Sequence, residues 1–341
     1  MRLTTRGRVT LAVAVAAVVM AWLFGARSLN AVAVPAVVAV VAAVAQVRLA
    51  DQPSAERSNL PAGFPDETRE VTVSITGSRG TIVEATDPHP AGLSSTDNTV
   101  SGSLPTTHTY ELTLTERGKH EVGPLAVTLR DVFGLVTHEV TVGDPTNVLV
   151  YPAIHDVGGS TVLTAELERA RRPERQEIDQ LREYVPGDRL RDIDWKSSAK
   201  RLPDLIVTEF VGREVTGAIR IAVSADRDTA DATASAVASV ALFFARAGLE
   251  VGVHTPDGAL EPAQGVAHRT ELLGLLAETG AGTVSEQTWA DADVRVAGED
   301  GTVTLDVDGR NSTFEEIRAG DGRDGNTVAS LESERTEVTT A

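Results

Sequence analysis

Three carboxylates stand close together in the middle of the chain, at Asp188, Asp192 and Asp194. Carboxylates at such spacing can divide acid and base roles in a hydrolysis reaction, or can hold a metal ion. Each of these aspartates has an arginine nearby in the sequence, and an aspartate beside an arginine tends to stay ionised. The pattern therefore favours ion pairing, and we expect no enzymatic activity. A carboxylate-dependent hydrolase that uses these residues is the alternative.

The stretch that holds these carboxylates, residues 181–214, combines a turn, interleaved charges and a tryptophan. It contains R-E-Y-V-P-G-D at 182–188, R-D-I-D-W at 191–195 and S-A-K at 198–200, followed by an apolar segment at 205–209 that ends in glutamate. Adjacent proline and glycine predict a tight turn in the first motif. The whole order resembles the signature of the domain of unknown function 58 (DUF58) family.

We expect this signature to be a structural clasp between domains, with one face offered to a protein partner. Its charges occur as matched neighbours, and the chain has no G-x-x-x-x-G-K-[ST] loop for a nucleotide. The strand at 205–210 is expected to join the edge of the sheet that begins at Ala218. The residues assigned to the signature are Arg182, Glu183, Tyr184, Pro186, Gly187, Asp188, Arg191, Asp192, Asp194, Trp195, Ser198 and Lys200.

After Ala218 the sequence alternates between strand and helix patterns. We predict strands at 219–223, 250–254, 293–296 and 302–307, and helices at 230–247 and 270–278. Such alternation predicts an α/β domain with a parallel, Rossmann-type sheet covered by helices. The family resemblance implies a von Willebrand factor A-like domain at this place.

The resemblance also implies where a magnesium site would begin, because the A-type fold carries D-x-S-x-S directly after its first strand. Here the corresponding positions are Ser224, Asp226 and Asp228, so hydroxyl and carboxylate positions are exchanged. We expect a loop in which Asp228 caps the next helix, where an acid meets the positive end of the helix dipole. The prediction is no cofactor, with Mg²⁺ on these three residues as the alternative.

Residues 66–150 contain short segments that alternate apolar and polar side chains. The clearest are at 70–76, 81–85, 107–115 and 125–129. Short strands at this spacing predict an all-β, Ig-like sandwich.

Two motifs within this β region are similar to patterns found upstream in the same family. They are R-G-K-H-E-V-G-P at 117–124 and D-V-F-G-L at 131–135, with valine where proline is usual. We interpret Gly123 and Gly134 as positions without room for a side chain. We expect Phe133 to fill the core.

Two apolar runs, residues 9–25 and 31–47, lie close to the N-terminus. Each has about 17 residues, so a helix would span roughly 25 Å, at the short end for a bilayer core of about 30 Å. We predict a helical hairpin that anchors the chain in the lipid bilayer. The alternative is a cleaved signal peptide, but a second apolar run so close behind the first argues against it.

Arginines flank these two runs unevenly. The connecting loop holds Arg27 alone, whereas the outer flanks hold Arg2, Arg6, Arg8, Arg48 and Arg57. Positive charge favours the cytoplasmic side of a membrane. We therefore predict that both termini and the soluble domains are cytoplasmic.

The composition is strongly acidic, with a formal net charge of -18, and lysine is present only at Lys119, Lys196 and Lys200. Acidity with so little lysine predicts a salt-adapted surface of the kind found in halophilic archaea. Nucleic-acid binding is disfavoured, because neutralising phosphates requires clustered basic residues. The chain has no cysteine, which excludes disulfides and thiolate metal sites.

These observations predict a multi-domain protein with a helical hairpin at 1–50, a β-sandwich at 66–150, a helical linker with the signature at 151–216, an A-like domain at 217–310 and a disordered acidic tail at 318–341. The family resemblance implies a MoxR-type AAA+ ATPase as partner, because members are typically encoded beside one. We predict a membrane-anchored, non-enzymatic factor for protein interaction or assembly. The opposite topology would favour an outward-facing, metal-dependent adhesion protein.

Overall fold

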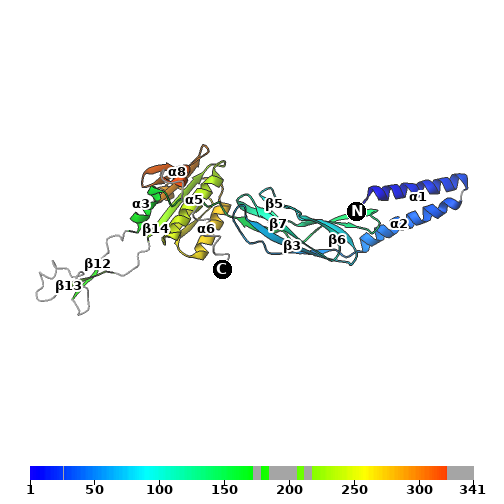
Figure 1. Cartoon of the computed structure of the whole chain (residues 1–341), viewed down its shortest axis with the longest axis horizontal. Coiled ribbons are helices and arrows are strands. Elements are labelled where there is room, and N and C mark those ends of the chain that lie inside the picture. The colour runs from blue at the N-terminus through cyan, green and yellow to red at the C-terminus, as the bar shows by residue number, and fades with distance from the viewer. Residues whose placement is uncertain (26, 172–177, 184–205, 211–216, 321–341) are drawn as a thin grey trace, which may run out of the picture. The chain divides into compact units, whose positions relative to one another are not determined.

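The computed structural model describes residues 1–25, 27–171, 178–183, 206–210 and 217–320 (Figure 1). The chain divides into two compact units, Met1–Ala153 and Ile154–Ala341. Most of the tail predicted at 318–341 lies outside the described residues.

The first unit begins with two long apolar helices, α1 (Thr5–Phe24) and α2 (Asn30–Leu49), with the short 3-10 helix η1 (Arg27–Leu29) between them. Thr4 caps α1, since its hydroxyl accepts a hydrogen bond from the backbone N–H of Gly7. Both helices are long and apolar enough to cross a membrane, and most of their side chains are exposed. The predicted pair of apolar helices is confirmed.

The rest of this unit is a β-sandwich, as predicted. One sheet has the order β1-β10-β9-β4-β6, a second has the order β2-β3-β7-β5, and β11 pairs with β8. The strands are β1 (Arg2–Leu3), β2 (Ser54–Arg57), β3 (Thr68–Thr76), β4 (Ile82–Thr86), β5 (Leu93–Ser95), β6 (Thr99–Ser103), β7 (Thr106–Leu114), β8 (Gly118–Val122), β9 (Leu125–Arg130), β10 (Val136–Val142) and β11 (Thr146–Val150).

Alternation along the strands builds the core of the sandwich. In β3, Val71, Val73 and Ile75 are buried while the residues between them are more exposed. In β7, Leu112 and Leu114 are buried in the same cluster. A strand places successive side chains on opposite faces, so this period of two gives each sheet one apolar face.

The helices are joined directly to the sandwich. Arg2 and Leu3 pair in antiparallel register with Thr137 and Val136 of β10. Gly7 allows α1 to approach the loop before β10, because a Cβ there would lie 2.2 Å from the carbonyl oxygen of Leu135. The N-terminus of α1 is therefore part of the same packed structure as the sandwich.

The second unit contains a six-stranded sheet with the order β16-β15-β14-β17-β18-β19. Its strands are β14 (Ala218–Ala225), β15 (Glu250–Thr255), β16 (Gly258–Ala263), β17 (Val294–Glu299), β18 (Thr302–Val307) and β19 (Arg310–Thr313). The central pairs β14–β15 and β14–β17 are parallel, whereas all other pairs are antiparallel. The expected parallel sheet is therefore corrected to a mixed one.

Tight turns account for the antiparallel strands. Asp300 and Gly301 connect β17 to β18, Asp308 and Gly309 connect β18 to β19, and all four have positive φ. Two-residue turns with positive φ at both positions match the twist of a hairpin, which is why Asp-Gly is favoured there.

Helices cover this sheet. Helix α5 (Ala230–Arg246) packs on β14, β15 and β17, and α6 (Val266–Glu278) packs on α5 and β16. Helix α3 (Thr161–Ala170) contacts β18, α7 (Glu286–Ala290) contacts β14, and α8 (Phe314–Ala319) contacts β18 and β19. The side chain of Phe244 on α5 is fully buried at the centre of the unit.

Candidate functional site

The two described parts of the signature are strands that pair with each other. Strand β12 (Ile178–Glu183) and strand β13 (Ile206–Phe210) form a separate two-stranded antiparallel sheet, with Leu181 opposite Thr208. The expectation that this second strand joins the sheet beginning at Ala218 is wrong. Strand β13 pairs instead with β12, an antiparallel neighbour nearby in the sequence.

Of the predicted signature residues, Arg182 and Glu183 lie in β12. The others lie outside the described residues: Tyr184, Pro186, Gly187, Asp188, Arg191, Asp192, Asp194, Trp195, Ser198 and Lys200. The predicted ion pairs among them, and the clasp that they would form, stay predictions.

The segment that contains the signature is rooted at one place on the α/β unit. Helix α3 ends at Ala170, and a Cβ on Gly217 would lie 2.2 Å from the carbonyl oxygen of Ala170. Gly217 also accepts a hydrogen bond from the backbone N–H of Glu250, at 3.0 Å. The Arg171 guanidinium donates to the carbonyl oxygen of Ala247, at 2.7 Å. The chain thus leaves and re-enters the unit beside the start of β15.

A buried carboxylate fixes α3, from which this segment departs. Glu166 is only 4% exposed, and its carboxylate accepts hydrogen bonds from Arg169 at 3.0 and 3.2 Å. Arg169 also pairs with Asp308 at 3.2 Å. Burial raises the pKa of Glu166, although the hydrogen bond from Arg169 acts in the opposite direction. This cluster pins α3 to the β18–β19 turn.

The second candidate site is the loop between β14 and α5. Ser224 is half-buried at the end of β14, whereas Asp226 and Asp228 are exposed. Asp228 does not cap the helix, which corrects that expectation: the N-cap position is Thr229, and no side chain caps it. The Thr229 hydroxyl donates to the carbonyl oxygen of Gly298 at 2.8 Å, so it ties the loop to β17 instead.

One buried hydroxyl beside this loop has no partner. Thr233 is fully buried, and its Oγ1 accepts or donates no hydrogen bond. A Cβ on Gly298 would lie 2.1 Å from that oxygen. The Thr233 hydroxyl thus lies directly over the backbone of Gly298 in β17. In the described part of the chain no three acidic or histidine side chains gather as metal ligands. Mg²⁺ binding by Ser224, Asp226 and Asp228 therefore stays an alternative prediction, on one half-buried and two exposed side chains.

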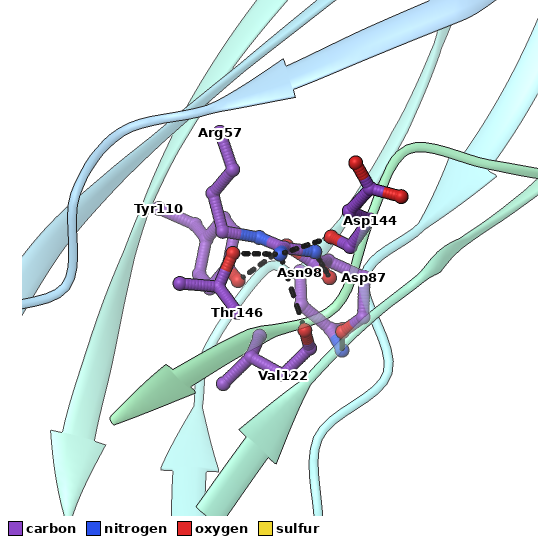
Figure 2. A network of polar contacts seen from close by, with 7 residues as sticks. All are labelled: Arg57, Asp87, Asn98, Tyr110, Val122, Asp144 and Thr146. Atoms are coloured by element: carbon purple, nitrogen blue, oxygen red, sulfur yellow. Dashed lines mark hydrogen bonds and ion pairs between the residues drawn. The ribbon is translucent and has the colours of Figure 1, made fainter. Parts of the chain in front are cut away.

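Among the described residues, the most deeply buried ion pair lies in the β-sandwich and was not predicted (Figure 2). Arg57 and Asp87 are 3% and 2% exposed, and their closest approach is 2.6 Å. Asp87 also accepts a hydrogen bond from the Tyr110 hydroxyl at 2.8 Å, and Asn98 donates to the Asp87 carbonyl oxygen at 2.8 Å. Burial, and then the charge of Asp87, raises the pKa of Tyr110.

The Arg57 guanidinium completes this cluster with neutral acceptors from other strands. They are the carbonyl oxygens of Val122 and Asp144, at 3.1 and 3.4 Å, and the hydroxyl of Thr146, at 2.9 Å. Gly123 borders the same group, since a Cβ there would lie 2.3 Å from an Arg57 nitrogen, which supports the expectation that no side chain fits. The cluster thus links several strands of the sandwich through side chains that are closed off from solvent.

Three further expectations need correction, for Phe133, Arg57 and Gly134. Phe133 is 62% exposed and does not fill the core. Arg57 is buried, so it does not add a positive charge to the surface beside the two apolar helices. Gly134 does have room for a side chain, since a Cβ there would meet nothing closer than 3.9 Å, and it is its positive φ of +67° that favours glycine. The sequence held a hint of the first result, because Phe133 lies in a Gly-containing turn between two strands.

The structure thus defines a class of protein with two apolar N-terminal helices, a β-sandwich, and an α/β unit that has a mixed sheet and the separate two-stranded sheet of β12 and β13. Residues 180–300 match the model of a family described as "Protein of unknown function DUF58", which supports the family assignment made from the signature.

A comparison with curated proteins found no match. Among solved structures, the chain is similar to a PapD-like domain of human CEP192, with 12% identity over 28% of this chain and 84% of that one, at a TM-score of 0.21. It is also similar to WR4, an MSP family member of C. elegans, with 6% identity over 28% and 96% of the two chains, at a TM-score of 0.20. A mutant of the SrpA adhesin of Streptococcus sanguinis matches with 13% identity over 40% and 84%, at a TM-score of 0.19.

Proposed function

We propose that this protein is a membrane-anchored, non-enzymatic assembly factor that binds protein partners through the extension on its α/β unit. The observation that carries the proposal is the two-stranded sheet of β12 and β13, whose strands do not pair with the six-stranded sheet. A two-stranded sheet is marginally stable by itself in water. An edge strand with free backbone groups can gain a further strand or a packed helix from a partner protein.

The partner that we propose is a MoxR-type AAA+ ATPase, which would supply the nucleotide energy. The α/β unit would act as a von Willebrand factor A-like binding domain. Its central parallel strands, with α5 packed on them, support that assignment. The acidic composition with three lysines supports our further proposal that the protein works at high salt concentration.

We further propose that α1 and α2 span the membrane and that the sandwich is cytoplasmic. The pairing of Arg2 and Leu3 with β10 supports this, because it places the N-terminus and the sandwich on the same side of a hairpin. The same pairing argues against cleavage of α1 as a signal peptide. With Arg57 buried, the outer flanks still carry Arg2, Arg6, Arg8 and Arg48 against Arg27 in the connection.

Affinity capture from detergent-solubilised membranes, with and without ATP, tests the partnership. The matched variant replaces residues 172–216 by a short Gly-Ser linker, which the adjacent positions of Arg171 and Gly217 permit. We expect the full chain to capture an AAA+ ATPase in a nucleotide-dependent manner and the excised variant to lose it. Thermal unfolding of both proteins shows whether the α/β unit is intact. Equal capture by the two proteins, or capture of no ATPase, would refute the proposal.

A further inference from the structure

The loop between β9 and β10 carries two large apolar side chains that are exposed on the surface. Val132 and Phe133 are 61% and 62% exposed. A contiguous exposed apolar patch can mark a site of interaction with a protein or a membrane.

The loop is held in one conformation by Asp131, which is fully buried. Its Oδ1 accepts a hydrogen bond from the backbone N–H of Val136 at 2.6 Å, and its Oδ2 accepts one from the N–H of Phe133 at 2.9 Å. Gly134 has φ of +67°, a left-handed conformation that glycine adopts without strain. The two apolar side chains therefore point outward because the backbone is fixed.

This loop lies against the two apolar helices. The Thr4 hydroxyl donates to the carbonyl oxygen of Gly134 at 2.6 Å, and the N–H of Val132 lies 3.5 Å from Oε1 of Gln46. Leu135 belongs to one buried cluster with Ala43 of α2. The exposed pair is thus continuous with the lipid-facing surface of the helices.

Two grooves meet at Phe133 and differ in chemistry. The apolar groove runs along the helices and is lined by Thr5, Arg6, Val9, Thr10, Ala39, Phe133 and Leu135. The more polar groove contains Arg6 and Arg130. Ala39 lies seven residues before Gln46, so this apolar groove reaches about 10 Å further along α2 than the loop backbone does.

We propose that the 131–135 loop is a lipid-inserting wedge. Val132 and Phe133 enter the hydrocarbon edge of the same bilayer that α1 and α2 cross. Arg6 and Arg130 face the phosphates of the lipid headgroups, and Arg130 also pairs with the exposed carboxylate of Glu84 at 3.4 Å. Aromatic side chains are favoured at this depth, and arginine can extend toward the phosphate layer. The wedge gives the sandwich a second attachment to the membrane, which fixes its orientation. This inference rests on the proposed membrane anchor.

The absence of cysteine makes single-cysteine labelling a direct test. Full-length Val132→Cys and Phe133→Cys proteins are labelled with an environment-sensitive nitrobenzoxadiazole dye and reconstituted into vesicles of phosphatidylcholine and phosphatidylglycerol. Val15→Cys, at an exposed position on α1, is the lipid control. Ser94→Cys, at an exposed position on β5, is the water control, because β5 lies at the end of the sandwich away from the helices (Figure 1).

We expect the dyes at Val132 and Phe133 to shift to the blue and to be quenched by lipids that carry a doxyl group near the top of the acyl chain. The dye at Val15 should be quenched, and the dye at Ser94 should not. If the loop dyes behave like the dye at Ser94 while Val15 is in lipid, the wedge is refuted and the anchor stands. If the dye at Val15 is also in water, the proposed anchor itself fails.

Discussion

Removing the carboxylate of Asp87 should destabilise the β-sandwich far more than removing an exposed carboxylate. Asp87 is the anionic partner of the Arg57 guanidinium, and both side chains are at most 3% exposed. In Asp87→Ala the guanidinium keeps three neutral oxygen acceptors but loses its counter-charge. Breaking a buried pair in this way costs about 3–5 kcal/mol.

Hydrogen exchange of the full-length protein in detergent micelles can measure this loss. The slowest amides of β3 and β7 report the opening of the whole sandwich, so 3–5 kcal/mol corresponds to exchange faster by about two to four orders of magnitude. The matched control is Glu84→Ala, because Glu84 pairs with Arg130 at 3.4 Å on the surface. An exposed pair contributes about 1 kcal/mol or less.

A double variant separates the lost charge pair from lost packing. Arg57→Met combined with Asp87→Leu leaves no unpaired charge in the core, so it should recover part of the stability lost in Asp87→Ala. If Asp87→Ala and Glu84→Ala accelerate exchange equally, the Arg57–Asp87 pair is not desolvated and the reasoning is wrong.

Three further predictions concern single side chains. Gly7→Ala should displace α1 from Leu135 at a cost of about 1–3 kcal/mol and expose the β10 amides to exchange, whereas Gly102→Ala, whose Cβ would meet nothing closer than 3.5 Å, should not. Burial raises the pKa of Tyr110, so the folded state favours its neutral form. The resulting contribution to stability is present below about pH 10 and is lost as the pH rises further. The urea unfolding midpoint should therefore fall above that pH, and Tyr110→Phe should remove this pH dependence. Burial also raises the pKa of Glu166, so the folded state favours its protonated form. The resulting contribution to the free energy of unfolding is present below about pH 4.5 and is lost as the pH rises through the folded-state pKa. In urea unfolding, Glu166→Gln should remove this pH dependence.

The elements with long, regular patterns were predictable from local sequence. The two apolar runs became α1 and α2, and the Ala-rich segment at 230–247 became α5. The Asp-Gly pairs at 300–301 and 308–309 are also signals for hairpin turns, and such turns predict antiparallel strands on either side. The alternation of strands and helices corresponds to the central parallel pairs alone, whereas the Asp-Gly turns specify the antiparallel strands at the edge.

The candidate sites were less predictable, because they depend on which segments meet. Ser224, Asp226 and Asp228 are residue types found in metal sites, but Ser224 is half-buried and the two aspartates face solvent. Phe133 has the type of a core residue, yet Asp131 fixes its backbone so that the ring points outward. Residue type alone does not specify whether a side chain points into the core or toward the surface.

The sequence by itself determined the apolar helices, the alternating strands and the family signature, because these depend on residue order within one segment. Only the tertiary structure decided that Arg57 pairs with Asp87 in the core and that β12 pairs with β13. It also decided that Arg2 and Leu3 join the sandwich. These outcomes depend on contacts between separate segments of the chain. Burial determines how strongly two charges interact, and the need to satisfy backbone hydrogen bonds determines which strands pair.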